Sequence, residues 1–171
     1  MIKRVSKNAF SLIELLVILT IFSIMLLIAI SYGCELVGKN RAQAYVDKLR
    51  AALLFTRASA ISFGEPVMLC GSKNHDKCGD SWQDDLIVIT HSGKLLRVLP
   101  KAFSGDELKW FSSRGINDRV IFLPMGFTDG EQNGSFYYCP KNHPENGLRL
   151  ILVPSGRPNI SRTTCLLHRR L

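Results

Sequence analysis

The sequence predicts an α+β fold in which one long N-terminal helix packs on a small antiparallel β-sheet or sandwich head. A nearly uninterrupted apolar run extends from Phe10 to Ile30, and a helical pattern follows it as far as Phe63. From Pro66 onward, short runs rich in Val, Ile, Leu and aromatic residues alternate with Gly, Pro, Asn and Asp clusters, which is typical of strands and turns. The 171 residues suffice for one head plus an N-terminal anchor.

The apolar run is predicted to be a transmembrane helix over residues 10–33. Fifteen of the 21 residues in 10–30 are Leu, Ile, Val or Phe, and together they contribute roughly −4.5 to −9 kcal/mol to insertion. The run also reaches the ~20 residues that a bilayer-spanning helix needs. Glu14 is its only charge. Such a carboxylate marks a functional site by default, although a stray Glu near the end of an ordinary anchor is the alternative.

Residues 34–64 are predicted to continue as an amphipathic helix. Small and apolar residues recur at steps of three and four and form one narrow stripe. The stripe consists of Ala42, Tyr45, Leu49, Leu53, Thr56 and Ala60. We expect this stripe to pack on the head. Gly64 provides a stop for the helix, and Pro66 prevents its resumption.

Residues 65–171 are predicted to form the head. Eight candidate strands are separated by turn residues, and the Thr90–Lys94 segment is typical of a tight hairpin turn. The candidates are Val67–Cys70, Leu86–Thr90, Lys94–Leu99, Glu107–Phe111, Arg119–Leu123, Ser135–Cys139, Leu148–Val153 and Arg157–Ile160. Their spacing predicts a small antiparallel arrangement with the helix laid across it.

The net charge of +8 is unevenly distributed. Between Pro140 and Leu171, six basic residues stand against Glu145 alone, which gives this region +5. The six are Lys141, Arg149, Arg157, Arg162, Arg169 and Arg170. A basic region of this kind indicates an anionic partner such as nucleic acid, lipid headgroups or an acidic protein. The alternative is a surface charge that serves only solubility.

The segment Lys7–Glu14, with the sequence KNAFSLIE, resembles the processing site of type IV pilin-like proteins. This resemblance implies that a prepilin peptidase removes residues 1–9 as a leader by cutting between Ala9 and Phe10. The new amine of Phe10 is then methylated. The resemblance also implies that Glu14, at the fifth mature position, pairs with the terminal amine of a neighbouring subunit. The family usually has Gly before the cut, whereas this chain has Ala9.

Later motifs resemble the FimT/GspH group of minor pilins, and most closely FimT. They are Cys70 and Cys78 before Trp82, then Phe122–Gly126, Gly134–Cys139, Arg149-Leu150 and Ser155-Gly156-Arg157. The resemblance implies a type IV pilin-like fold, held in the inner membrane by a single pass with a periplasmic head. After assembly the head lies outside the cell or in the periplasm. The implied partners are other pilin subunits and the prepilin peptidase.

The predicted periplasmic head contains four cysteines, and disulfides persist in that oxidising compartment. We expect the pairs Cys70–Cys78 and Cys139–Cys165, with Cys34 left as a free thiol. The rival interpretation is a metal site, because His75 lies near the first pair and His143 near Cys139. No pair has the Cys-x-x-Cys spacing of structural zinc sites, so we expect no metal and no cofactor. The sequence also lacks the common catalytic motifs, so we expect neither an enzyme nor catalytic residues.

Two functions of different classes remain. The first is a type IV pilus subunit that binds double-stranded DNA without sequence preference during natural transformation. Its expected DNA-binding residues are Arg157, Arg162, Arg169 and Arg170, with Arg149 and Lys141. Natural-transformation FimT proteins have Gly-Arg followed two residues later by another Arg. Here Gly156-Arg157 matches, but the next arginine is Arg162. The second function is a GspH-like structural pseudopilin of a type II secretion system.

Overall fold

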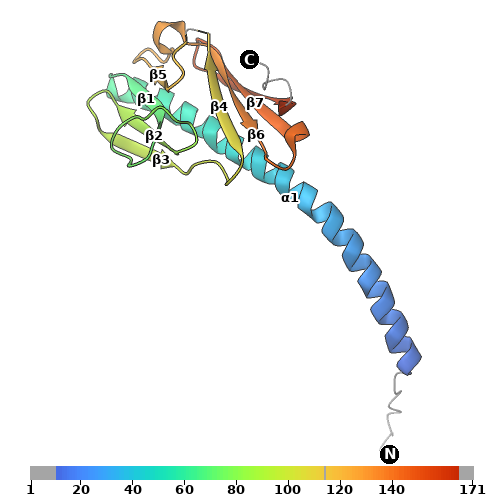
Figure 1. Ribbon diagram of the computed structural model, residues 1–171. Coiled ribbons are helices and arrows are strands. Elements are labelled where there is room, and N and C mark those ends of the chain that lie inside the picture. Colours follow the sequence, from blue (N-terminus) through green and yellow to red (C-terminus); the bar gives the residue numbers. More distant parts are fainter. Residues whose placement is uncertain (1–10, 114, 166–171) are drawn as a thin grey trace, which may run out of the picture. The chain divides into compact units, whose positions relative to one another are not determined.

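The computed structural model describes residues 11–113 and 115–165, without the side chains of residues 29–37 and 131. The chain divides into two compact units, Met1–Val37 and Gly38–Leu171. The helix α1, Leu12–Phe63, contributes its first part to one unit and its last part to the other (Figure 1). The second unit is the head.

The described part of the first unit is a regular helix with an apolar surface. Its large side chains are exposed in the isolated chain, Leu12 by 82% and Leu27 by 69%. The hydroxyls of Thr20 and Ser23 each donate to a carbonyl of the preceding turn, both at 2.8 Å, and are thereby satisfied within the helix. Among the described residues, no helix is long and apolar enough to cross a membrane. The span expected over residues 10–33 stays a prediction.

In the head, α1 buries the stripe that its sequence pattern predicts. All six stripe residues are at most 4% exposed, with Leu49, Leu53, Thr56 and Ala60 at 0%. The helix ends at Phe63, and Gly64 follows with φ +66°, the left-handed conformation common after helix ends. The Gly64 N–H donates to the carbonyl of Ala60 at 3.1 Å. The last turn is therefore closed where the sequence predicts the stop.

The described part of the head contains eight strands, each within three residues of a predicted one. They are β1 Val67–Ser72, β2 Asp85–Thr90, β3 Leu95–Leu99, β4 Glu107–Ser112, β5 Arg119–Phe122, β6 Gly134–Cys139, β7 Gly147–Leu152 and β8 Pro158–Thr163. Two antiparallel sheets result. The first sheet has the order β3-β2-β1-β5 and the second has the order β4-β6-β7-β8. Two short 3-10 helices, η1 Asp129–Glu131 and η2 Pro144–Asn146, lie in the loops before β6 and β7.

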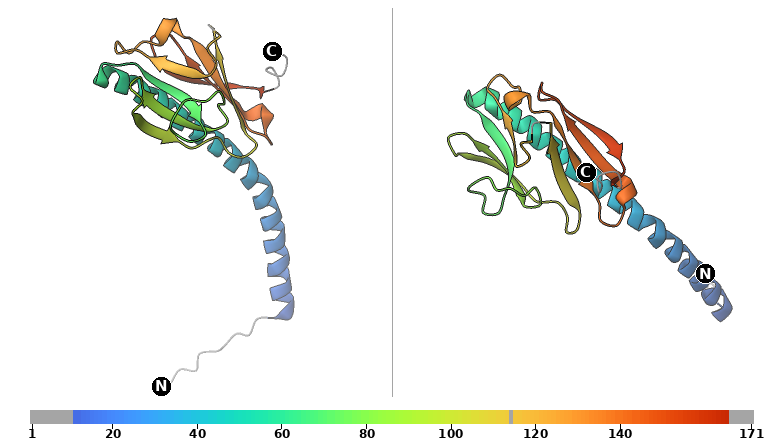
Figure 2. Two further views of the ribbon diagram at one scale, coloured as in Figure 1. Left: turned by 60° about the vertical axis from the view of Figure 1, so that its left-hand side comes forward. Right: turned by 45° about the horizontal axis from the view of Figure 1, so that its top comes forward.

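The core lies where the two sheets meet the helix. In Figures 1 and 2 the head part of α1 runs between the sheets, with one sheet on each flank. Leu53 of the helix, Leu69 of the first sheet and Leu150 of the second belong to one buried cluster. Trp82 and Phe136 add a perpendicular ring contact at 4.9 Å between centroids. The fold is thus a helix packed on two antiparallel sheets, as the sequence predicts.

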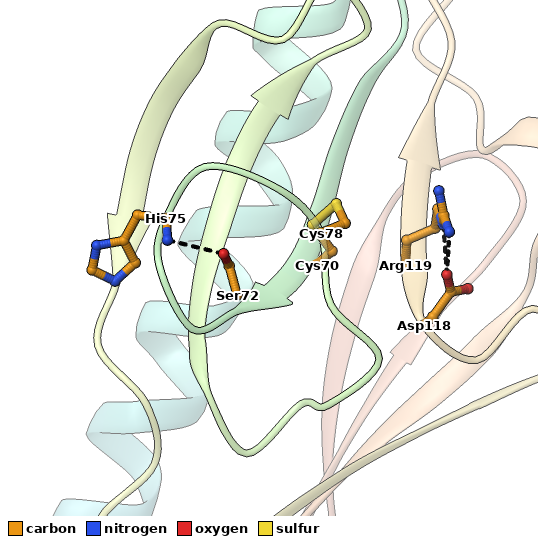
Figure 3. The surroundings of a disulfide bond; sticks show 6 residues. All are labelled: Cys70, Ser72, His75, Cys78, Asp118 and Arg119. Carbon is orange, nitrogen blue, oxygen red and sulfur yellow. Dashed lines mark hydrogen bonds and ion pairs between the residues drawn. A yellow bond between two sulfur atoms is a disulfide. The ribbon is translucent and has the colours of Figure 1, made fainter.

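Both expected disulfides, Cys70–Cys78 and Cys139–Cys165, are present in the structure. The first joins buried Cys70 of β1 to Cys78 in the loop before β2 (Figure 3). The backbone N–H of His75 donates to the Ser72 hydroxyl at 3.0 Å within this loop. The side chain of Cys34, expected to be a free thiol, is outside the described side chains.

The adjacent residues Leu53 and Leu54 offer a matched test of this packing. Leu53 is fully buried, whereas Leu54 is 41% exposed. We expect Leu53→Ala to lower the free energy of unfolding of the head by about 2–5 kcal/mol, because it leaves a cavity between helix and sheets. Leu54→Ala should change it by about 0.5 kcal/mol or less. Urea unfolding of both variants checks this, and equal losses would contradict the described orientation of α1.

Candidate functional site

The assembly segment begins at the described start of α1. The carbonyl of Ser11 accepts hydrogen bonds from the N–H groups of Glu14 at 3.1 Å and Leu15 at 3.2 Å. Glu14 therefore lies in the first helical turn, where the helix dipole stabilises a negative charge. The expected cleavage and methylation residues, Ala9 and Phe10, lie outside the described residues.

The expected DNA-binding residues come from the second sheet and its connections. Arg149 lies on β7 and Arg162 on β8, while Arg157 lies in the turn between these strands. Lys141 follows β6. The side chains of Arg157, Arg162 and Lys141 are exposed, and that of Arg149 is half-buried. Arg169 and Arg170 lie outside the described residues.

The strand register distributes these cations over two faces of the second sheet. Arg162 is the direct partner of buried Leu148, and Arg149 is the direct partner of Ser161. Directly opposed residues share a face and successive residues alternate. Arg149 therefore points away from the core, and Arg162 lies on the side of the core, at the open edge of the sheet. Arg157 and Arg162 follow the edge strand β8, whereas Arg149 lies on β7 and Lys141 after β6, so these cations do not form one compact patch.

The turn that carries Arg157 is firmly held. Gly156 has φ +73°, and its N–H donates to the carbonyl of Val153 at 2.8 Å. Thr128 donates to the carbonyl of Pro154 from its N–H at 3.1 Å and from its hydroxyl at 3.2 Å. These bonds attach the β7–β8 turn to a neighbouring loop. Arg157 thus extends from a backbone whose position is fixed.

The opposite end of β8 is fixed covalently. Cys165, two residues after β8, is bonded to Cys139, the last residue of β6. Gly147 at the start of β7 lies so close that an added Cβ would come within 2.7 Å of the Cys165 sulfur. Arg169 follows Cys165 by four residues in the sequence. The disulfide therefore sets the point from which the basic C-terminal residues start.

Asp106 organises the backbone beside Lys141. Its carboxylate accepts hydrogen bonds from the Tyr138 hydroxyl at 2.5 Å and the Lys141 N–H at 3.1 Å, and Arg41 lies at 3.5 Å. Burial, and next the bond to Asp106, raises the pKa of Tyr138 well above its usual range. The hydroxyl therefore remains protonated as a donor. Asp106 thereby fixes the backbone from which the exposed side chain of Lys141 extends.

The described residues do not support the metal alternative. Cys70 and Cys78 are bonded to each other, and His75 Nε2 lies 2.7 Å from a carboxylate oxygen of Asp85. The Lys101 N–H, and next His75, hold the pKa of Asp85 below its usual range. Within the described chain, no group of three or more His, Cys, Asp or Glu residues could hold a metal ion.

One feature of the second sheet was missed in the sequence. Lys109 of β4, Tyr137 of β6 and Arg149 of β7 are direct partners in one row that points away from the core. Phe111 packs against Tyr137 with ring centroids 5.6 Å apart. The sequence contained part of the signal, because each of these residues alternates with apolar residues along its predicted strand. The pairing of β4 with β6 brings these positions together, and the sequence pattern does not specify that pairing.

Comparisons with known proteins point to one group. The family model described as type II transport protein GspH matches residues 46–156, and the prokaryotic N-terminal methylation motif matches residues 4–30. The chain is similar to crystal structures of the type IV minor pilin FimU of Pseudomonas aeruginosa. One has a TM-score of 0.57 and 19% identity, over 74% of this chain and 96% of that chain. The second crystal form has a TM-score of 0.53 and 20% identity, over 72% and 98%.

A further similar structure is the minor pseudopilin EpsH from the type 2 secretion system of Vibrio cholerae. Its TM-score is 0.51 at 12% identity, over 71% of this chain and 97% of that chain. No curated protein sequence matches the chain. At these identities the structural likeness establishes the fold, and the family model establishes the group.

The held turn before Arg157 allows a matched pair of glycine substitutions. An added Cβ at Gly156 would lie 2.7 Å from the carbonyl oxygen of Gly126 and 2.9 Å from the ring of Phe122. Gly93 has a similar positive φ of +89° but nothing within 4 Å of an added Cβ. We expect Gly93→Ala to destabilise the head by about 1–2 kcal/mol from backbone strain alone. Gly156→Ala should cost clearly more. Thermal unfolding of both variants measures the difference, and equal costs would argue against the tight packing of this turn.

Proposed function

The chain belongs to the GspH family, and on that premise we propose that it is a minor pilin that binds DNA. It is a minor pilin or pseudopilin of a type IV pilus or of a type II secretion system. Within this group, the function that we propose is that of a type IV pilus subunit that binds double-stranded DNA without sequence preference during natural transformation. The observation that carries it is a pair of exposed arginines, Arg157 in the turn before the edge strand β8 and Arg162 on that strand.

Before assembly, the proposed subunit is held in the inner membrane by residues 10–33. A prepilin peptidase removes residues 1–9, and the exposed amine of Phe10 is methylated. The match of the methylation motif to residues 4–30 supports this route. Glu14 then pairs with the terminal amine of a neighbouring pilin subunit. Opposite charges attract strongly in a low-dielectric bundle, where each charge alone is costly to bury.

Two free guanidinium groups support DNA as the ligand. Arg157 and Arg162 are exposed, and neither has an acidic partner among the residues that the structure describes. A guanidinium group is planar and offers paired donors, which suits phosphate oxygens. No internal ion pair has to be broken before either guanidinium group binds a phosphate. Both arginines are therefore available at no internal electrostatic cost.

The spacing of these arginines fits a phosphate backbone. Five residues of extended chain separate Arg157 from Arg162, a distance of about 16 Å at ~3.3 Å per residue. One strand of duplex DNA carries a phosphate about every 3.4 Å along the helix axis. The two side chains can thus contact separate phosphates of one duplex. Phosphate contacts carry no sequence information, as uptake of DNA without a fixed sequence requires.

A second candidate is a GspH-like structural pseudopilin of a type II secretion system. The family match over residues 46–156 and the likeness to EpsH favour it. In that case the arginines of β8 contact an acidic neighbouring protein. The two candidates make different predictions for single arginine substitutions. These substitutions should weaken DNA binding if the chain is a DNA-binding pilus subunit, and should not affect it if the chain is a structural pseudopilin.

The DNA proposal predicts a defined salt dependence for the head, residues 38–171. If Arg157, Arg162, Arg169 and Arg170 each neutralise one phosphate, log K should fall with log salt at a slope of about −3.6. Binding should then weaken roughly 140-fold between about 50 and about 200 mM salt. Arg157→Gln and Arg162→Gln should each flatten the slope by about 0.9. A gel-shift or NMR titration with duplex DNA at several salt concentrations gives these slopes.

Arg97→Gln is the matched control for this titration. It removes the same charge from an exposed position on β3, in the other sheet. Its slope should equal that of the wild type. Equal binding by the wild type, Arg157→Gln and Arg162→Gln, or no wild-type binding at low salt, would reject the DNA proposal and leave the pseudopilin.

The assembly role of Glu14 gives a second test. Glu14→Val removes a costly charge from the apolar segment, so membrane insertion should be retained or improved. Incorporation into filaments should fall strongly, because the neighbour's terminal amine loses its partner. Ser23→Val is the control, since it removes a polar group that is satisfied within its own helix. Immunoblots of membrane and sheared filament fractions separate the two steps. Normal incorporation of Glu14→Val would contradict the pairing.

A further inference from the structure

The outer face of the second sheet carries a row of basic and aromatic side chains. Lys109, Tyr137 and Arg149 are cross-strand partners on the adjacent strands β4, β6 and β7 (Figure 1). The residues that alternate with them, such as Trp110 and Leu150, are buried in the core. Because side chains alternate along a strand, the row points outward. This outer face, comprising Lys109, Phe111, Tyr137 and Arg149, is distinct from the β8 edge described above.

The side chains on the outer face are ordered by mutual contacts. The rings of Phe111 and Tyr137 meet edge to face, with centroids 5.6 Å apart and planes at 77°. The Arg149 guanidinium lies 5.4 Å from the Tyr137 ring centroid, and its Nε donates to the Ser135 hydroxyl at 3.0 Å. Ser135 is only 4% exposed although it points outward. Phe111 nevertheless retains 39% of its surface to solvent.

A hollow at the edge of β4 adjoins the same ring. It has a volume of about 440 Å³, and Phe111 and Lys109 line it together with Trp82 and Trp110. Leu108, Ser81 and Asp80 complete the lining. The volume falls within the range of small-molecule sites. A flat aromatic group that contacts Phe111 therefore has room beside the strand.

We infer that this outer face binds an unpaired stretch of DNA, with bases stacked on Phe111 and Tyr137 and phosphates held by Lys109 and Arg149. Every base has a π-face, so aromatic side chains next to cations bind single strands without sequence preference. A duplex exposes only the edges of its bases in the grooves, so it offers no base face on which an exposed ring could stack. The rings therefore select a single strand, whereas the β8 edge suits either form of DNA.

The charges of this face fit the same ligand. Lys109 forms an ion pair with Glu107 at 2.7 Å, and both side chains are about half exposed. Such surface pairs are weak, so a phosphate can displace the carboxylate. Arg149 is oriented through Nε, which leaves its terminal nitrogens for a phosphate. The inference rests on the proposed DNA-binding function and adds the form of DNA that this second surface takes.

The test compares two single strands of equal charge, using the full-length protein in a neutral detergent. One is an oligo(dT) of about 20 nucleotides, longer than typical single-strand sites. The other is an abasic strand of the same length, which keeps the phosphates and lacks the bases. We expect the wild type to bind oligo(dT) about 10-fold more tightly than the abasic strand, measured by fluorescence anisotropy. Phe111→Ala should remove most of this preference and leave abasic binding unchanged.

Matched variants separate this inference from the proposed function. Phe111→Tyr keeps a ring and should restore the preference. Phe63→Ala removes a half-exposed ring near Lys94, away from the second sheet, and should not alter it. Arg157→Gln should weaken binding of both strands equally. Equal wild-type affinity for oligo(dT) and the abasic strand would overturn the stacking face, while arginine-dependent duplex binding would still stand. Absence of binding to any DNA would overturn both.

Discussion

The burial of one face of α1 between two sheets determines most of what this head presents to solvent. Leu49, Leu53 and Thr56 are fully enclosed, and each sheet turns one set of alternate side chains toward them. That requirement fixes which residues of every strand point outward. Arg149 faces solvent because Leu148 and Leu150 are needed in the core. The positions of the charged groups are thus a consequence of core packing.

The sequence was sufficient to predict the elements of the head. Gly64 ends the helix, and alternation with turn residues marks the eight strands, because these signals depend only on neighbouring residues. The pairs Cys70–Cys78 and Cys139–Cys165 were also expected, because the family resemblance places the four cysteines of the head in the oxidising periplasm. These features need either local information or a family pattern.

The sequence did not reveal the division of the basic residues between a strand edge and a sheet face. That division depends on the register of β7 with β8, where Leu148 opposes Arg162 and Arg149 opposes Ser161. Register is set by long-range packing and by turn geometry, and one residue of slip exchanges the two faces. The row of Lys109, Tyr137 and Arg149 depends in the same way on the pairing of β4 with β6. Single-sequence periodicity contains no information on either pairing.

The two edges of the second sheet are protected by different means, and the difference bears on function. At β4, the Gln83 amide donates to the carbonyl of Leu108 at 2.8 Å, and the Asn117 side chain accepts from the Ser112 N–H at 3.1 Å. These side chains thereby occupy backbone hydrogen-bonding groups through which another strand would pair with β4. At β8, Pro158 disfavours pairing with another strand because it has no backbone N–H to donate. Exposed Arg162 disfavours such pairing through its charge.

A neutral cap of the kind found at β4 would have protected β8 without leaving any charge exposed. The arginine there instead leaves a guanidinium group exposed at the same position, so edge protection and the proposed DNA binding are compatible at one residue. Edge protection alone, however, does not explain Arg157. This residue lies in a turn outside the strand, where no unpaired edge of the sheet needs protection. The charge at Arg157 is therefore the part of the basic edge that edge protection does not explain, and it gives the most direct support to the proposed anionic partner.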